Sequence, residues 1–135
     1  MTNSTESNVQ LVRDYLVAIQ RGEVGDALAR FFTADAMQIE LPNRLNPAGQ
    51  KSDLPTLLAR SIQGQRVLSA QRFDIESAIA QGDRVAVEAH WVGVLAISFG
   101  TLQVGSEMRA YFAMFFECRD GRIYIQRNYD CFEPW

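Results

Sequence analysis

Cysteine, histidine and proline are scarce in this chain of 135 residues, which has two cysteines, one histidine and four prolines. The two cysteines, Cys118 and Cys131, show no CxxC or Cys/His spacing, so the sequence indicates no metal site. We expect both to be buried as small hydrophobic residues, with a disulfide or a metal role as the alternative. Nothing in the sequence resembles a nucleophile–histidine–acid set or a phosphate-binding glycine loop.

Long hydrophobic runs are also absent. No segment approaches the ~18 consecutive apolar residues of a membrane span, and residues 1–10 lack both the cationic flank and the apolar stretch of a secretion signal. The net charge is −3, from 13 basic and 16 acidic residues, and the basic residues are scattered singly, which argues against nucleic-acid binding. We therefore expect a cytoplasmic protein, with neither a nucleic acid nor a membrane as its partner.

The patterns that are present follow an order, with helical spacing first and strand spacing afterwards. We expect a single domain over residues 1–135, with residues 1–6 disordered. Apolar spacing predicts helices over 5–21 and 24–32, a short strand over 37–41, a loop over 43–51, and a helix from an N-cap at Ser52 to Gly64. A period of two then predicts strands over 66–79, 84–97, 105–118 and 122–131. Helices gathered on one face of an antiparallel sheet give an α+β fold.

Alternation within these strands predicts which side chains face the interior. In 84–97 the apolar face holds Val85, Val87, Ala89 and Trp91, whereas His90 lies on the opposite, outer face. In 105–118 the even positions from Met108 to Phe116 are uniformly apolar and should be interior. In the last strand, Ile123, Ile125, Arg127 and Tyr129 share one face, and Tyr124, Gln126, Asn128 and Asp130 share the other.

Two segments carry a resemblance to a known family. Phe31-Phe32-Thr33-Ala34-Asp35-Ala36, followed by a short strand and Pro42, resembles a segment of the nuclear transport factor 2-like superfamily. The hairpin Asp120-Gly121-Arg122-Ile123, followed by Arg127-Asn128-Tyr129-Asp130, resembles the last two strands of that superfamily. Its SnoaL-like polyketide cyclases look nearest, with ketosteroid isomerase and limonene-epoxide hydrolase as cousins.

The resemblance implies a cone-shaped curved sheet wrapped over three N-terminal helices, with a ligand pocket at the wide end. It also implies a homodimer that pairs through the outer face of the sheet. On this basis the polar face of the last strand, which includes Gln126 and Asn128, lines the pocket. The alternative is that this face is the solvated side of an edge strand.

Three residues are candidates for catalysis by resemblance. Tyr15 takes the place of the isomerase's oxyanion-hole tyrosine, the alternative being a core tyrosine. Glu40 takes the place of its general base when the count starts from Asp35, but Leu41 does when the count starts from Pro42; a solvated Glu40 is the other alternative. Asp130 resembles an acid of polyketide cyclases, unless it only pairs with a nearby arginine.

Several departures from these relatives are visible in the sequence. Met114, or Ala113, stands where the isomerase has its second acid, and Ala89, Trp91 and Asn128 stand where the hydrolase has three of its polar residues. Neither of the two mechanisms is therefore complete. We still expect the pocket to bind its ligand through six residues: Gln38, Trp91, Phe112, Met114, Gln126 and Asn128.

The function favoured by these features is that of a cofactor-independent enzyme acting on a small hydrophobic molecule that carries a carbonyl group. Its reaction would be proton transfer, isomerisation or aldol-type cyclisation, with Glu40 or Asp130 as acid and base and Tyr15 as oxyanion donor. One alternative is a non-catalytic domain that binds a small apolar ligand. Another is a dimeric accessory module whose cavity is filled by side chains.

Overall fold

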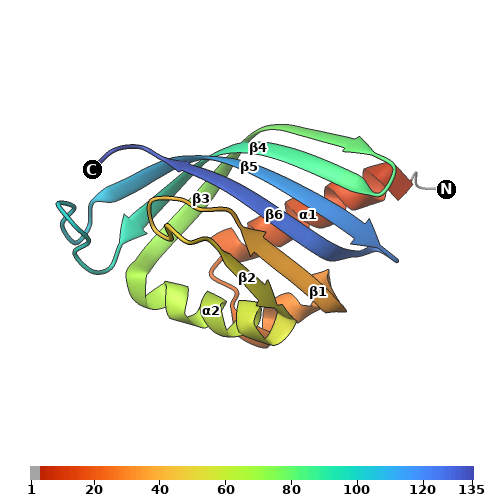
Figure 1. Ribbon diagram of the computed structural model, residues 1–135, viewed down its shortest axis with the longest axis horizontal. Helices are drawn as coiled ribbons and strands as arrows, with labels where there is room; N and C mark the ends of the chain where they lie inside the picture. Colours follow the sequence, from red (N-terminus) through yellow and green to blue (C-terminus); the bar gives the residue numbers. More distant parts are fainter. Residues whose placement is uncertain (1–3) are drawn as a thin grey trace.

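The computed structural model describes residues 4–135, which form helices packed on one face of a curved six-stranded sheet (Figure 1). The helices are α1 (Ser4–Gln20), the 3-10 helix η1 (Gly25–Phe31) and α2 (Leu54–Val67). The strands are β1 (Phe32–Glu40), β2 (Gln50–Asp53), β3 (Leu68–Gln81), β4 (Arg84–Leu95), β5 (Glu107–Arg119) and β6 (Arg122–Phe132). The expected α+β fold, with three helices and a curved sheet, is confirmed.

The strand order is β2-β1-β6-β5-β4-β3. All neighbours are antiparallel except β1 and β6, the first and last strands along the chain, which run parallel. The β5–β6 hairpin turns at Asp120 and Gly121, with φ of 53° and 74°. Two adjacent residues in the left-handed region give the tight turn that suits the twist of a β-hairpin, and an Asp-Gly pair is well suited to it.

The predicted inner face of the sheet forms the core. Val85, Val87, Ala89 and Trp91 of β4 are buried, as are the even positions of β5 from Met108 to Cys118. His90 lies on the outer face, stacked on Tyr111 with ring centroids 4.8 Å apart. The period-two pattern of these central strands was therefore sufficient to orient them.

The last strand differs from its predicted pattern because of a β-bulge. The β5–β6 register shifts between Glu117 and Cys118, so that Ile123 pairs with Cys118 whereas Ile125 pairs with Glu117. Ile123 is consequently on the inner face and fully buried, although alternation places it with Ile125. Beyond the bulge, Gln126 pairs with Phe116 on the inner face.

Several predicted boundaries are corrected by the structure. Helix α1 begins at Ser4, so residues 4–6 are helical rather than disordered, and residues 1–3 lie outside the described part. The cap of α2 is Asp53, whose side chain accepts a hydrogen bond from the Thr56 amide at 3.0 Å, and not Ser52. The helix continues through Gly64 to Val67, and part of the predicted loop is strand β2. Cys118 is buried, but Cys131 is exposed.

Candidate functional site

A row of polar side chains lies on the inner face of β1 and β6. It consists of Gln38 and Glu40 of β1 with Gln126, Asn128 and Asp130 of β6. Gln38 pairs with Gln126 and Glu40 pairs with Asn128 in the parallel register, which brings residues almost ninety positions apart into contact. We call these five residues the polar row; they are the β1 and β6 residues predicted for the site.

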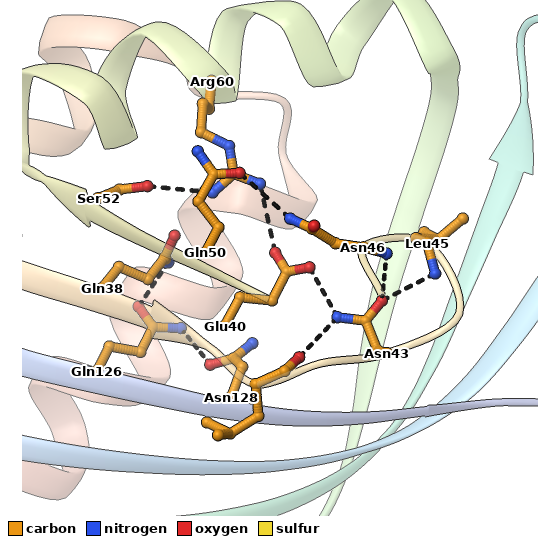
Figure 2. Close-up of polar contacts among 11 residues, drawn as sticks. Gln38, Glu40, Asn43, Leu45, Asn46, Gln50, Ser52, Arg60, Gln126 and Asn128 are labelled. Carbon is orange, nitrogen blue, oxygen red and sulfur yellow. Dashed lines mark hydrogen bonds and ion pairs between the residues drawn. The ribbon is translucent and has the colours of Figure 1, made fainter. Parts of the chain in front are cut away.

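Glu40 is held in place by two side chains (Figure 2). The Arg60 guanidinium of α2 forms an ion pair with it, with 3.3 Å between Nη2 and Oε1. The Asn43 amide donates to Oε2 at 2.7 Å and to the Leu41 carbonyl at 2.9 Å. Arg60 also donates to the buried Ser52 hydroxyl at 3.2 Å. The Glu40 carboxylate is therefore fixed by both α2 and the loop that follows β1, rather than being solvated.

Asn43 organises the loop between β1 and β2. Its side-chain oxygen accepts hydrogen bonds from the backbone amides of Leu45 at 2.9 Å and Asn46 at 3.1 Å, while its amide nitrogen reaches Glu40 (Figure 2). An Asn side chain that closes such a turn replaces backbone hydrogen bonds that the loop lacks. Sequence reasoning missed Asn43 and Arg60; the Pro-, Gly- and Asn-rich composition of 43–51 was the available signal for the loop.

Asp130 has a different environment from Glu40. Burial and the nearby charge of Glu40 raise the pKa of Asp130 to about 7, against the opposing effect of a hydrogen bond from the Asn128 side chain. Its Oδ1 is buried without a hydrogen-bond partner in the described residues. Two carboxyl groups in one site, one held by a cation and one pushed towards its neutral form, are typical of a division between electrostatic and acid–base roles.

A cavity of about 380 Å³ lies between α1, η1, α2 and the start of β3. Its wall includes Tyr15, Gln38, Arg60 and Gln71. Of the nine predicted site residues, Tyr15 and Gln38 belong to this wall. The other polar-row residues lie beyond it, and Gln38 and Arg60 connect them to the cavity, since Gln38 bonds to Gln126 and Arg60 to Glu40. The volume is within the range of small-molecule pockets, ~300–1,000 Å³.

Tyr15 borders the cavity from α1. Its ring makes edge contacts with three core phenylalanines, the nearest being Phe32 with centroids 5.1 Å apart. The residue is buried, and burial raises the pKa of its phenol above the ordinary value. The residue belongs to the cavity wall. A neutral phenol of this kind is a donor available to a bound ligand.

The aromatic residues predicted to bind ligand pack against one another. Trp91 stacks on Phe112 with centroids 5.3 Å apart, and Phe132 contacts both rings edge-on. The Trp91 indole donates to Gln71 Oε1 at 2.9 Å. Met114, opposite Asn128 in the register, is also buried. We call Trp91, Phe112 and Phe132 the aromatic cluster; it occupies the part of the interior next to Asp130, which pairs with Phe112.

The rest of the described chain offers three further findings. Among residues 4–135, no three His, Cys, Asp or Glu side chains are grouped so that they could hold a metal ion. Within the same range, none of the helices has the length and hydrophobicity needed to cross a membrane. On the outer face of the sheet, Tyr111, Phe115 and Tyr129 are exposed by 55%, 41% and 44%.

Solved structures with this fold are numerous. AclR, a proposed hydroxylase from Streptomyces galilaeus, aligns with a TM-score of 0.78 at 13% identity over 96% of this chain and 82% of its own. IdmH, a proposed polyketide cyclase from Streptomyces antibioticus, aligns with 0.75 at 19% identity over 91% of each chain. A protein of ketosteroid isomerase-like fold from Catenulispora acidiphila DSM 44928 aligns with 0.71 at 18% identity, over 88% and 83%.

At these identities the alignments establish the fold alone. No curated protein sequence matches the chain. The sequence family described as the SnoaL-like domain matches residues 12–125, which extend from α1 into β6 and so include Tyr15, Gln38 and Glu40. With its cone-like sheet, its three helices and this match over most of its length, the chain belongs to the SnoaL-like domain family.

Proposed function

We propose that this protein is a cofactor-independent enzyme that moves a proton on a small hydrophobic molecule bearing a carbonyl group. The observation that carries the proposal is the environment of Asp130. An acid with a pKa of about 7 is divided between its two protonation states near neutral pH, which suits a group that must both take and return a proton. The buried, unpartnered Oδ1 leaves one of its oxygens available for this step.

In the proposed reaction the Asp130 carboxylate removes a proton from the carbon next to the carbonyl. The electron pair of that C–H bond forms the carbon–carbon double bond of an enolate, and the negative charge moves to oxygen. The substrate has to extend from the cavity to Asp130 for this step, and the Tyr15 hydroxyl at the cavity wall then donates a hydrogen bond to the enolate oxygen. Neutral Asp130 then returns the proton, either to the same carbon or to another one, which gives exchange or isomerisation.

Glu40 has an electrostatic role in this scheme. Its carboxylate accepts a hydrogen bond from Asn43 and forms an ion pair with Arg60. Its negative charge opposes ionisation of Asp130 and so favours the state in which Asp130 has taken up the proton. Of the two carboxylates predicted as the acid–base residue, we therefore propose Asp130, supported by its raised pKa and its unpartnered Oδ1.

The test is deuterium incorporation at the α-carbon of 2-tetralone, a bicyclic ketone, in D₂O. We expect wild type to accelerate incorporation over the buffer rate, and Asp130→Asn to lose at least about 100-fold of that acceleration, the lower end of general-base contributions. Asp74→Asn, at an exposed position on β3, is the matched control and should retain the wild-type rate. Tyr15→Phe should slow incorporation without unfolding the protein.

A non-catalytic binding domain is the second candidate, favoured by the absence of both carboxylates from the cavity wall. Binding of 2-tetralone to the cavity with no acceleration of exchange in wild type would support that function and refute the enzymatic one. Equal rates for wild type and Asp130→Asn would refute the role of Asp130.

A further inference from the structure

Three amide side chains of the polar row form a directed chain of hydrogen bonds (Figure 2). Gln38 Nε2 donates to Gln126 Oε1 at 3.1 Å, and Gln126 Nε2 donates to Asn128 Oδ1 at 2.8 Å. Gln126 is buried at 3% exposure, so its amide cannot exchange these partners for bulk water. Gln38 ends the chain at the cavity wall.

The direction of this chain is set at its other end, by Asp130. An ionised carboxylate accepts hydrogen bonds and donates none. Asn128 and Asp130 lie two residues apart on the same face of β6, so Asn128 turns its NH₂ group towards ionised Asp130, and this interaction lowers the pKa of Asp130 against the larger effects of burial and Glu40. Asn128 Oδ1 is then left for Gln126, and Gln126 Oε1 for Gln38. Of the amide oxygens in this hydrogen-bond chain, Gln38 Oε1 is left without a hydrogen-bond partner among residues 4–135.

We propose that Gln38 is a specificity-determining residue whose cavity-facing atom is set by the protonation state of Asp130, an inference that rests on the proposed function of this cavity. With Asp130 ionised, Gln38 presents a carbonyl oxygen, which selects a ligand hydroxyl. Protonated Asp130 donates its own O–H to Asn128 Oδ1. Each amide in turn then rotates by half a turn about its last side-chain bond, and Gln38 presents NH₂, which selects a ligand carbonyl or enolate oxygen.

A second amide at the cavity wall provides a fixed reference. The Trp91 indole N–H can only donate, so Gln71 Oε1 must accept from it and the Gln71 NH₂ group is left over. No member of the polar row bonds to Gln71, so its orientation does not depend on Asp130. A ligand that fits both amides needs one oxygen that accepts a hydrogen bond from the Gln71 NH₂ group. Its second oxygen, facing Gln38, is a hydroxyl when Asp130 is ionised and a ketone when Asp130 is protonated. A hydroxyketone or an enolisable diketone meets both requirements.

The charged groups around Asp130 allow the change to occur near neutral pH. Glu40 faces it from β1, Arg60 of α2 is paired with Glu40, and its β5 partner, Phe112, is uncharged. Burial and the charge of Glu40 raise the pKa of Asp130 to about 7. The orientation of Gln38 is therefore expected to reverse between about pH 6 and pH 8.

The test compares the affinities of 1-tetralol and 1-tetralone, a bicyclic alcohol and ketone with the same skeleton, by calorimetry at pH 5.5 and 8.5. We expect the alcohol-to-ketone affinity ratio to rise by about three- to tenfold from the lower to the higher pH, the range that one net hydrogen bond supports. Asp130→Asn should make the ratio independent of pH. Asp74→Asn should leave the pH dependence intact.

Two further variants test the middle of the hydrogen-bond chain and its cavity end while leaving Asp130 in place. Gln126→Met removes the central link, and Gln38→Met removes the cavity-facing amide without changing a buried position. Both should abolish the pH dependence of the ratio, while ¹³C NMR should still detect Asp130 titrating well above its ordinary range. If Gln126→Met unfolds, Gln38→Met alone is sufficient.

Each outcome bears on the inference. A ratio that does not change with pH in wild type, while Asp130 titrates, would overturn it, as would a wild-type pH dependence that persists in Gln38→Met. Failure of both probes to bind would also overturn it. A pH-dependent ratio without deuterium exchange would refute the proposed function and leave the role of Gln38 supported. Exchange with a constant ratio would do the reverse.

Discussion

The two halves of the inner sheet face differ in the side chains that they present. On β4 and β5 the inward side chains are apolar, and there the aromatic cluster closes the space by ring contacts. On β1 and β6 the inward positions hold the polar row, whose members bond to one another and to α2. The comparison shows that an inward position indicates burial but does not separate a core residue from a site residue. What separates them is whether their polar atoms remain available.

The largest expected effect concerns the aromatic cluster. We expect Phe112→Ala to lower the free energy of unfolding by about 3–5 kcal/mol, because it leaves a cavity between Trp91 and Phe132. Phe115→Ala on the same strand is the matched control, with an expected cost below about 1 kcal/mol because Phe115 is on the exposed outer face. Urea denaturation measures both. If both variants lower the free energy of unfolding by a similar small amount, and Phe112→Ala alone loses ligand binding, then Phe112 is a ligand-binding residue, as the sequence predicted.

The next largest effect concerns the polar row, where we expect a substitution to raise the free energy of unfolding rather than lower it. The pKa of Asp130 is about 7 when folded, well above the ordinary carboxyl value of 3.8. The folded state therefore binds its proton more tightly than the unfolded state, and this contribution to stability is present in full below about pH 4 and is lost as pH rises towards 7. At pH 8 we expect Asp130→Asn to stabilise the protein by about 1–3 kcal/mol, since it removes a buried charge.

Denaturation at pH 4 and pH 8 measures this effect. The difference between Asp130→Asn and wild type should be smaller at pH 4, where Asp130 is neutral in the folded protein. Asp130→Asn that is less stable than wild type at pH 8 would show that the Asp130 carboxylate has stabilising partners, and the contrast between the two halves of the face would then disappear.

The smallest expected effect extends the comparison to the outer side of β5. We propose that the exposed aromatic residues Tyr111, Phe115 and Tyr129 take part in a homodimer through the outer sheet face. Phe115→Glu should weaken dimerisation by at least about tenfold, about 1.4 kcal/mol, by placing a charge in the interface. Sedimentation equilibrium measures this, with Glu76→Gln on β3 as the control. A wild type that remains monomeric at micromolar concentration would remove the proposal.

Local patterns predicted most of the fold but only part of the site. The alternation in 105–118 and 84–97 was sufficient to identify the inner face, because both strands are buried on one side and regular in register. Strand β2 was missed because Gln50–Asp53 contains no hydrophobic alternation and exists through its pairing with β1. Ile123 was misplaced because a bulge depends on the partner strand and leaves no mark in its own spacing.

The site depended on contacts between distant segments. Resemblance placed Gln38, Glu40, Gln126, Asn128 and Asp130 near one another, and the parallel β1–β6 register brings them together. Neither the ion pair of Glu40 with a residue of α2 nor the stacking of Trp91 on Phe112 could be read from local sequence. These two contacts decide which predicted residues keep available polar atoms, and where the cavity lies.

The pairing of the first strand with the last has a consequence for folding. Strand β1 ends at residue 40, and its parallel partner begins at residue 122, so the polar row can form only after the whole chain between them has been synthesised and its long loop closed. Contacts of such long sequence separation are slow to form. We expect amide hydrogens of β1 to gain protection from exchange late in refolding, together with those of β6, so that ligand binding reports the completed fold and no partial one.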